Sequence, residues 1–555
     1  MKRAGSESEG PRAGGDRWRI VLLIAVAIFA VVLALLASDR GVFNYHTETD
    51  YVGSFAVEAG RLLRGEPLRI SFHPPWYPVV LATAFTFVGD WFAVGTGVSV
   101  LASVITVLAA AALWRRALGV AASIGAAAAL MASPIYISFS AQATSDVFSH
   151  ALHTVALLAT WVGARRRTVP TGLLAGLVIG LALLTRTNNV VLFALLSFYL
   201  VPVTALAPAD RADEPAVRPT RGLARFTGLA AAVVGIALPL LAWAAFANAT
   251  GAPVIPTKTH ENLALTYFSA GNDRISGDAR LEAAAGFTSS LDVVLSDPLH
   301  IARTYARDLV TSSFVLLARN SLLPFPLIAV GALAFVVVWW QRRDRRLALT
   351  LLLGNLALMY LLTNAKAFEH RYYFFLLPLV GAAIGAVLAP LLGPRSRPAS
   401  RAFGWLSLIA AAGIAVAFTV AETPRRYGSD WSTDAAAAAS FLRDAGLPTA
   451  EVVFAYKPHL AFYLEARDGR TLPRSADVDA LMGDLRAVPH EGTGAAYLFF
   501  GTTERRARPQ LMSLADAAGP VPDGLTRVAQ GDERGGWVLY RIEDPPRPDA
   551  EPGPP

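Results

Sequence analysis

The sequence predicts a polytopic α-helical membrane protein with an α/β domain at its C-terminal end. Of its 555 residues, 54% are hydrophobic and only 16% are charged, whereas soluble domains have about 25% charged residues. Several uncharged stretches reach the roughly 20 residues that a helix needs to cross the hydrocarbon core of a bilayer. They lie at 20–38, 93–114, 119–139, 187–208, 320–341, 372–394 and 402–421. This composition excludes a single soluble globule.

The basic residues predict the orientation of the chain. Short basic clusters lie between the apolar stretches, at 115–116, 165–167, 211–225, 342–346 and 395–401. Cytoplasmic loops are enriched in Lys and Arg, so we expect these clusters and the polar N-terminal segment 1–19 to be inside. The first span, 20–38, is longer than the core of a signal peptide and is expected to be a retained anchor. This pattern also makes nucleic acid an unexpected partner.

Placing the clusters inside requires eleven membrane spans. They are expected at 20–38, 93–113, 119–137, 147–163, 169–185, 187–206, 226–247, 321–341, 347–364, 372–392 and 402–420. Residues 74–89 then have no crossing of their own and are expected to lie in the outer interface. Inserting this segment and splitting another span gives a thirteen-span alternative. Only four of the 49 basic residues are lysine, a bias typical of GC-rich bacteria, so we expect a bacterial inner (plasma) membrane.

An odd number of spans puts the C-terminal end outside. Two long outer segments, 39–73 and 248–319, interrupt the predicted membrane domain 20–421. Residues 422–543 are expected to form an extracytoplasmic α/β domain, because helical and β-rich patterns alternate there. We expect helices at 432–445, 458–464, 476–487 and 509–518, and strands at 451–456, 496–500, 525–529 and 537–542. The proline-rich tail 544–555 is expected to be disordered.

The first outer segment carries two carboxylates at the membrane boundary, Glu48 and Asp50. Either could act as a base, and capping of a following helix is the structural alternative for Asp50. His73 precedes Pro74 and Pro75, whose rings fix the direction in which the next helix begins. A simple turn residue is the alternative interpretation of His73.

Cations lie at other predicted outer span ends. Arg186 separates two uncharged spans, and its guanidinium fork matches the geometry of phosphate oxygens. A snorkelling anchor is the alternative. Further charged or titratable candidates are Lys258, His260, Glu261, Lys366 and Arg371. Together they predict a site for an anionic ligand with a base beside it.

Asp146 is an isolated outer carboxylate at the start of a span. His150 and His153 follow it at spacings that share one helical face, which permits a metal site, although polar core packing is the favoured interpretation. The chain has no cysteine, which excludes thiolate metal sites and disulfides. It also lacks a Gly-rich phosphate loop, an HExxH and a GxSxG motif. We expect no cofactor, and dependence on a divalent metal stays open.

The order of these motifs resembles the GT-C membrane glycosyltransferases, in particular the protein O-mannosyltransferase and lipid A aminoarabinose transferase type. The resemblance covers about residues 20–390. It depends on the acidic motif at Asp50, the His73-Pro74-Pro75 motif, the loop ending at Asp146, the Leu184-Thr185-Arg186 turn and the Arg371-Tyr372-Tyr373 segment. The family's acidic pair reads Asp50-Tyr51 here, so Glu48 is an alternative carboxylate.

This resemblance implies transfer of a sugar from a polyprenyl-phosphate donor on the outer face, with inversion and without a nucleotide. It also implies Asp50 as general base and Arg186 as a ligand of the donor phosphate, with Lys258, Arg371 and His73 as further candidates. Such a displacement needs a base for the acceptor hydroxyl and cations for the departing phosphate. The residues do not distinguish a lipid, protein or polysaccharide acceptor. An O-antigen-ligase-type enzyme and a lipid or glycan transporter are the alternatives.

Overall fold

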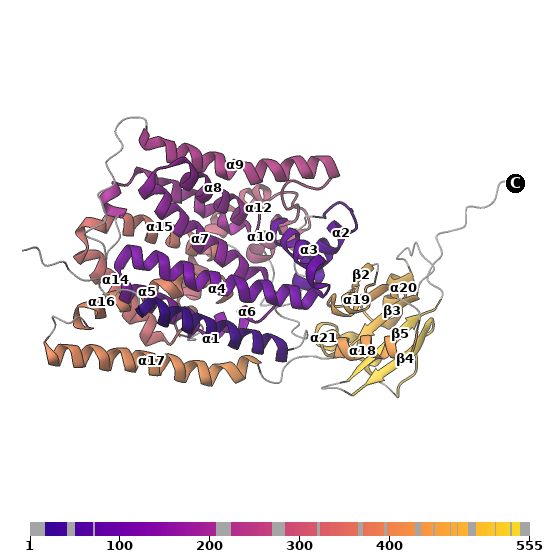
Figure 1. Cartoon of the computed structure of the whole chain (residues 1–555). Helices are drawn as coiled ribbons and strands as arrows, with labels where there is room; N and C mark the ends of the chain where they lie inside the picture. Colours follow the sequence, from indigo (N-terminus) through magenta and orange to yellow (C-terminus); the bar gives the residue numbers. More distant parts are fainter. Residues whose placement is uncertain are drawn as a thin grey trace, which may run out of the picture.

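The computed structural model shows a large helical bundle with a smaller α/β domain at one end (Figure 1). It describes the following residues: 17–40, 50–69, 73–206, 224–268, 283–318, 322–364, 370–392, 397–427, 434–447, 450–466, 468–473, 475–486, 495–516, 518–532 and 536–543. The predicted disordered tail 544–555, and most of the N-terminal segment 1–19, lie outside these residues.

Six helices are long and apolar enough to cross a membrane, and a bent pair raises this number to seven within the part of the chain that is described. The six are α1 (Arg17–Arg40), α4 (Trp91–Leu118), α7 (Ser145–Arg166), α9 (Ala224–Thr250), α15 (Arg346–Asn364) and α17 (Pro398–Tyr427). Shorter apolar helices are α3 (Trp76–Val88), α8 (Val169–Leu183), η2 (Thr187–Leu200), α14 (Phe325–Gln341) and α16 (Leu376–Leu392). A multi-pass membrane protein is confirmed, and eleven crossings stay a prediction.

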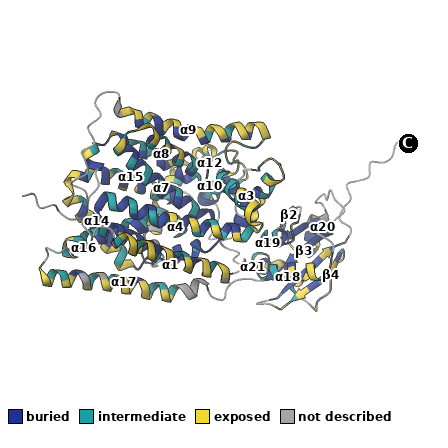
Figure 2. Ribbon diagram, viewed as in Figure 1, coloured by how far each residue is buried: buried dark blue, intermediate teal, exposed yellow. Residues whose placement is uncertain are grey.

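The bundle has enclosed helices at its centre and lipid-facing helices at its edge. In the most apolar 18 residues of each helix, 67% are buried in α7 but only 17% in α1 and 12% in α17. Figure 2 shows that exposed residues run along α1, α9 and α17. Exposed residues such as Leu23 and Leu406 are apolar, as expected for surfaces that contact acyl chains instead of water.

Three predicted spans differ locally from straight α-helices. The span expected at 119–137 bends by 69° between α5 (Val120–Met131) and α6 (Pro134–Ser140). Ser133 explains the break, because its Oγ caps α6 and also donates to the Leu322 carbonyl at 2.8 Å. The span expected at 187–206 is the 3₁₀ helix η2 followed by η3 (Val203–Leu206), and the span expected at 372–392 begins as η5 (His370–Tyr373).

Close helix pairs in the bundle depend on glycine. A Cβ atom on Gly381 of α16 would lie 2.0 Å from the Gly125 carbonyl of α5, and one on Gly176 of α8 would lie 1.9 Å from the Ala232 carbonyl of α9. Small residues allow helix backbones to approach closely inside a membrane, where water does not drive helices together. These two contacts therefore leave no room for larger side chains.

The long outer segments are partly helical. The first contains the π-helix η1 (Tyr51–Phe55) and α2 (Ala56–Leu63), directly before α3. The prediction treated 248–319 as a loop, but this segment contains α10 (Thr259–Phe268), α12 (Ser290–Ser296) and the 21-residue helix α13 (Pro298–Ala318). These helices escaped prediction because their polar residues place them outside the apolar pattern used to find spans.

The C-terminal domain is a mixed five-stranded sheet of order β2-β1-β3-β5-β4. The strands are β1 (Ala450–Ala455), β2 (Asp468–Thr471), β3 (Ala495–Phe500), β4 (Leu525–Gly531) and β5 (Trp537–Ile542). The helices are α18 (Asp434–Asp444), α19 (His459–Tyr463), α20 (Val478–Arg486), α21 (Thr502–Ala507) and the 3₁₀ helix η6 (Pro509–Ala515). The four expected strands are present, whereas β2 and α21 were not predicted.

The sheet combines parallel and antiparallel pairs, and its central strand β3 is covered on both faces. β1 pairs in parallel with β2 and β3, while β5 pairs in antiparallel fashion with β3 and β4. All six residues of β3 are buried, with separate apolar clusters on the two faces of the sheet. A central strand covered on both faces is expected to be apolar without alternation.

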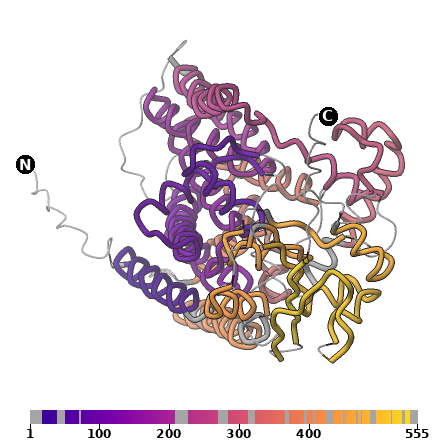
Figure 3. Tube along the Cα trace, turned by 90° about the vertical axis from the view of Figure 1, so that its right-hand side faces the viewer, coloured from indigo at the N-terminus to yellow at the C-terminus, as the bar shows by residue number. Residues whose placement is uncertain are grey.

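The C-terminal domain contacts the end of the bundle that carries Asp50. Phe462 of α19 packs edge to face on Phe92 with ring centroids 5.6 Å apart. A Cβ atom on Gly53 of η1 would lie 2.8 Å from Cγ of Pro458, so only glycine permits this approach. Figure 3 shows the domain in front of the bundle when the molecule is viewed from this end.

A reporter fusion checks the predicted orientation. We expect alkaline phosphatase fused after Glu422 to be active, because the predicted topology places this position on the outer face. The same reporter fused after Arg116 should be inactive. An inactive fusion after Glu422 together with an active fusion after Arg116 would show the opposite orientation. The carboxylates and cations described below would then lie on the cytoplasmic side of the membrane.

Candidate functional site

The candidate site lies where the first outer segment meets the turn between α8 and η2. The backbone N–H of Trp76, at the start of α3, donates to the Leu184 carbonyl at 2.8 Å. This bond joins the His73-Pro-Pro segment to the Leu184-Thr-Arg186 turn. Two motifs more than 100 residues apart in the sequence therefore form one side of the site.

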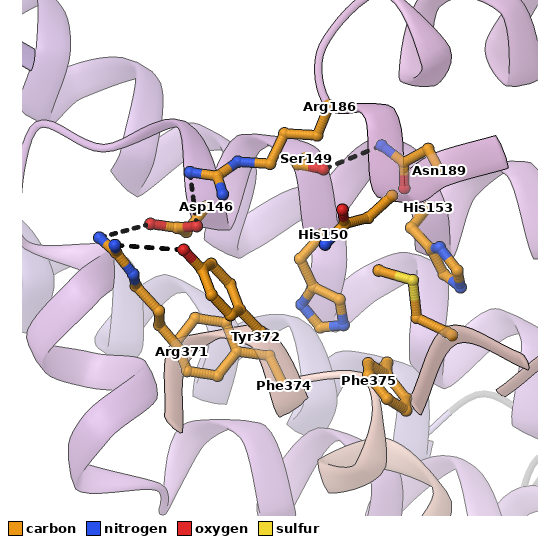
Figure 4. A pocket seen from close by; sticks show the side chains of 12 residues that line it. Asp146, Ser149, His150, His153, Arg186, Asn189, Arg371, Tyr372, Phe374 and Phe375 are labelled. Carbon is orange, nitrogen blue, oxygen red and sulfur yellow. Dashed lines mark hydrogen bonds and ion pairs between the residues drawn. The ribbon is translucent and has the colours of Figure 1, made fainter. Parts of the chain in front are cut away.

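Asp146 lies at the centre of the site between two arginines. Its Oδ1 is 2.7 Å from Nη2 of Arg186, and its Oδ2 is 3.4 Å from Nη1 of Arg371. Figure 4 shows both contacts. The side chains are 3%, 14% and 11% exposed, respectively. Because charges inside a protein need partners, this triad explains how a carboxylate is tolerated at the start of an apolar helix.

The beginning of α7 positions the carboxylate of Asp146. Thr144 caps the helix, since its Oγ1 accepts a hydrogen bond from the Asp146 N–H at 3.2 Å. The same hydroxyl donates to Oδ2 of Asp146 at 2.9 Å. A negative charge in the first turn is also favoured by the helix dipole. These local contacts therefore orient Asp146 independently of the two arginines.

The arginines are held by additional contacts. Arg186 donates from Nε and Nη2 to Oγ of Ser145, at 3.2 and 2.9 Å. Arg371 donates to the Tyr372 hydroxyl at 3.3 Å. The Tyr372 ring lies 5.6 Å from the guanidinium carbon of Arg186 and 5.1 Å from that of Arg371, which is within the range of a cation–π interaction. The triad carries one net positive charge on preorganised guanidinium groups.

Asp50 is in a different environment from Asp146. Its side chain is 43% exposed, and its Oδ2 lies 4.0 Å from Nε2 of His73. It makes no capping hydrogen bond to the helix that follows, so the capping alternative is not formed. The site thus contains one buried, ion-paired carboxylate and one accessible carboxylate, an arrangement that lets two similar groups have different roles.

His73 packs against the segment that carries Asp50. Its ring lies 4.6 Å from the ring of Phe55. Burial lowers the pKa of His73 to about 4, while the Asp50 charge acts in the opposite direction. The imidazole is therefore neutral at pH 7 and adds no positive charge beside Asp50.

The remaining predicted candidates are separate or outside the described residues. Lys258 contacts Glu261 at 3.5 Å, at the start of α10 that also contains His260. None of these three residues lines the pocket described below. Glu48 and Lys366 fall outside the described residues. Their roles stay predictions.

A small pocket adjoins the triad. Its lining comes from α7, the α8–η2 turn, α15 and the segment before α16: Asp146, Ser149, His150, His153, Arg186, Asn188, Asn189, Met359, Arg371, Tyr372, Phe374 and Phe375. Among the residues with described positions, no group of three His, Asp or Glu side chains is arranged to hold a metal ion. The contacts of Asp146 go to arginines instead.

Sequence reasoning missed several members of the site. It did not identify Ser145, Ser149, Asn189 or Phe374 as site residues. These are short polar or apolar side chains inside spans, and they carry no recognisable motif. It named Asp146 only as a secondary candidate. One sequence signal could have raised its rank. An acid beside an apolar span requires a cation as partner, and Arg186 and Arg371 are both predicted at outer span ends.

A family profile matches part of the chain. Residues 72–207 match the profile of the dolichyl-phosphate-mannose-protein mannosyltransferase family. This segment contains His73, Asp146 and Arg186, and it confirms the resemblance to membrane glycosyltransferases of the protein O-mannosyltransferase type. No curated protein matches the chain by sequence.

Solved structures of membrane transferases are similar to the chain. The archaeal oligosaccharyltransferase AglB from Archaeoglobus fulgidus, in complex with an inhibitory peptide and a dolichol-phosphate, is 12% identical, with 85% of this chain and 67% of that chain covered and a TM-score of 0.49. ArnT from Cupriavidus metallidurans is 13% identical in the apo state, with 94% and 97% covered and a TM-score of 0.44. Its form bound to undecaprenyl phosphate is 15% identical, with 95% and 98% covered and a TM-score of 0.39.

Removal of the Asp146 charge should destabilise the protein. Asp146→Asn leaves two buried guanidinium groups without their shared partner, and breaking a buried pair in this way costs about 3–5 kcal/mol. We expect a lower thermal unfolding midpoint in detergent. The control is Asp344→Asn, because Asp344 is 67% exposed and the buried Arg345 beside it keeps its hydrogen bonds to the Arg116 and Ala117 carbonyls. Equal midpoints for the two variants would contradict a stabilising role of the triad.

Proposed function

We propose that this chain transfers a sugar from a polyprenyl-phosphate-linked donor to an acceptor hydroxyl on the outer face of the membrane. The family match over residues 72–207 supports a membrane glycosyltransferase. The observation that carries the finer proposal is the pair of buried guanidinium groups around Asp146, close to the accessible carboxylate of Asp50.

The charge of the triad suits the donor. A sugar linked to a polyprenyl phosphate is a phosphodiester with one negative charge, and the triad of Asp146, Arg186 and Arg371 carries one net positive charge. Binding would therefore neutralise the site. When the bond from the anomeric carbon to the phosphate oxygen breaks, negative charge develops on that oxygen, where fixed guanidinium donors stabilise the transition state more strongly than the ground state.

Asp50 supplies the base in this mechanism. Its exposed carboxylate accepts the proton of the acceptor hydroxyl, whose oxygen attacks the anomeric carbon on the face opposite the phosphate. The new glycosidic bond forms as the bond to phosphate breaks, so the configuration inverts and polyprenyl phosphate leaves. Phosphate is already a good leaving group, and the step needs no general acid. Neutral His73 lies 4.0 Å from Asp50 and adds no positive charge beside this carboxylate.

The proposal leaves the acceptor open among a lipid, a protein hydroxyl and a polysaccharide. The matching family comprises dolichyl-phosphate-mannose-protein mannosyltransferases, and similar structures hold undecaprenyl phosphate in ArnT and a dolichol-phosphate in AglB. A transporter would place ionisable groups near mid-membrane in broken helices. The location of Asp50, His73, Arg186 and Arg371 near one end of the bundle favours the enzyme. Analysis of lipids from a deletion strain tests this, because the unused donor should accumulate.

Asp50→Asn should abolish proton acceptance without removing the donor site. We expect normal expression, unchanged donor affinity and a turnover number lower by about 10²-fold or more, the usual size of a general-base contribution. Transfer of radiolabelled sugar by purified protein measures this. Asp90→Asn is the matched control, because Asp90 caps α4 through the Ala93 N–H at 2.7 Å and lies outside the site.

Glu48→Gln completes that comparison and should have a milder effect than Asp50→Asn. Loss of turnover in Glu48→Gln with an intact Asp50→Asn variant would move the base two residues upstream. An enzyme insensitive to both changes would contradict the mechanism. If essential residues mapped only to a late outer loop, the O-antigen-ligase-type alternative would be favoured.

Arg186→Lys keeps a positive charge but removes the fork that contacts both Ser145 and Asp146. An ammonium group cannot reproduce these parallel contacts. We therefore expect affinity for undecaprenyl phosphate to fall at least tenfold in a direct binding assay with protein in nanodiscs. The control is Arg307→Lys, because Arg307 is 62% exposed and pairs with Asp308 on α13. Near-normal affinity of the Arg186→Lys variant would indicate that Arg186 is a membrane anchor and does not bind the phosphate.

A further inference from the structure

The short helix η1 determines where the proposed base lies, because Asp50 directly precedes it. Tyr51, Val52 and Phe55 are the buried residues of η1 and pack in the bundle. The Tyr51 hydroxyl also donates to the Trp91 carbonyl at the start of α4. Contacts with the bundle thus hold one side of η1.

The C-terminal domain contacts η1 at Gly53. A Cβ atom at this position would lie 2.8 Å from Cγ of Pro458 and 3.6 Å from its Cβ. Pro458 directly precedes α19, and Phe462 of the same helix packs against the apolar cluster that contains the buried residues of η1. In Figure 1, α19 lies on the side of the domain that faces the bundle. A rigid ring and an aromatic side chain therefore bring the domain onto η1.

The strands behind this contact hold Pro458 in place. In α/β sheets, ligands bind at the carboxyl ends of parallel strands where the strand order reverses. β1 and β3 form such a pair, since β1 lies between β2 and β3 and is parallel to both. Here Glu504, which is 1% exposed, accepts hydrogen bonds from the Tyr456 N–H at 2.9 Å and the Gly501 N–H at 3.0 Å. The domain thus fills this crevice with its own side chain, and one of the two bonds fixes the segment that leads to Pro458.

We infer that the C-terminal domain is a clamp, which holds η1 against the bundle through Pro458 and Phe462 and so fixes Asp50 for catalysis. The inference rests on the proposed glycosyltransferase function, in which Asp50 is the base. Pro458 is then a positioning residue that acts through η1. The donor phosphate is assigned to the triad around Asp146, which lies on other elements of the chain. The clamp therefore governs turnover and leaves donor affinity unchanged.

Gly53→Ala should loosen the clamp. Carbon atoms in favourable contact are about 3.5–4.0 Å apart, so the added methyl group forces η1 and Pro458 to separate by about 0.7 Å or more. The proline ring is tied to its own backbone, so side-chain rotation does not relieve the contact. Because a misplacement of about 1 Å can cost about 10²-fold in rate, we expect turnover to fall about 10- to 100-fold. Affinity for undecaprenyl phosphate in nanodiscs and the donor KM should not change.

Pro458→Ala supplies a rescue. It removes Cγ and leaves Cβ, which would lie 3.6 Å from the added methyl group, an ordinary contact. The Gly53→Ala/Pro458→Ala double variant should therefore be clearly more active than Gly53→Ala alone, whereas two unrelated losses of stability would add. Gly97→Ala on α4 is the matched control, because its Cβ atom would meet no atom within 4 Å, and it should transfer sugar like the wild type. A double variant no more active than Gly53→Ala, or a loss of donor affinity in Gly53→Ala, would overturn the clamp.

A disulfide tests the clamp without relying on activity. The chain has no cysteine, and the 3.6 Å between Cβ positions at residues 53 and 458 lies within the roughly 3.5–4.5 Å of a disulfide. We expect the Gly53→Cys/Pro458→Cys variant to form this bond in membranes under mild oxidation, as detected by mass spectrometry of the linked peptides. The oxidised enzyme should keep its turnover. Each single cysteine variant is a control that forms no bond within one chain.

The possible results separate the clamp from the proposed function. Absence of the disulfide would overturn the clamp whatever the activity of the protein. An oxidised enzyme that is inactive and recovers on reduction would also overturn it, because the domain would then have to leave η1 during turnover. A wild-type protein that transfers sugar from no polyprenyl-phosphate donor would instead contradict the proposed function and the role of Asp50, even if the disulfide formed.

Discussion

The attraction between Asp146 and two arginines is the contact on which the candidate site depends. It joins the start of α7 to the turn before η2 and to the segment before α16, three parts of the chain that converge only in the fold. Charged side chains are costly beside apolar spans, so each member of the triad requires the others. The same requirement keeps two guanidinium groups fixed and close together, which is the condition for binding an anion without large reorganisation.

Burial separates the roles of the acidic residues around this contact. Asp146 is 3% exposed and bound to arginine, whereas Asp50 is 43% exposed beside a neutral His73. A buried, paired carboxylate is suited to hold cations in position, and an accessible one is suited to exchange protons with a substrate. The pocket extends this gradient inward, from charged groups at the mouth to neutral polar and aromatic groups at the floor, represented by His150.

Much of the fold could be predicted from local sequence properties, because the length of an apolar stretch and the position of a basic cluster can be recognised within a single span. The predicted spans fall on helical segments, although those at 119–137 and 187–206 are each divided between two helices, and the four predicted strands of the C-terminal domain are present. The 69° bend at Ser133 and the 3₁₀ geometry of η2 depend on packing between helices, which a local pattern does not contain. Asp50, His73, Arg186 and Arg371 were recognisable from motif order. The partnership of Asp146 with Arg371 was not, since it joins residues more than 200 positions apart.

The contact between Gly53 and Pro458 has a consequence for biogenesis. η1, next to Asp50, leaves the ribosome among the first segments of the chain, but α19, which packs against it, is made about 400 residues later. The surroundings of Asp50 are therefore completed only after the last span has been inserted and the C-terminal domain has folded. A chain truncated before this domain would contain every arginine of the triad and still lack the surface that packs on η1, so the complete site forms only at the end of biogenesis.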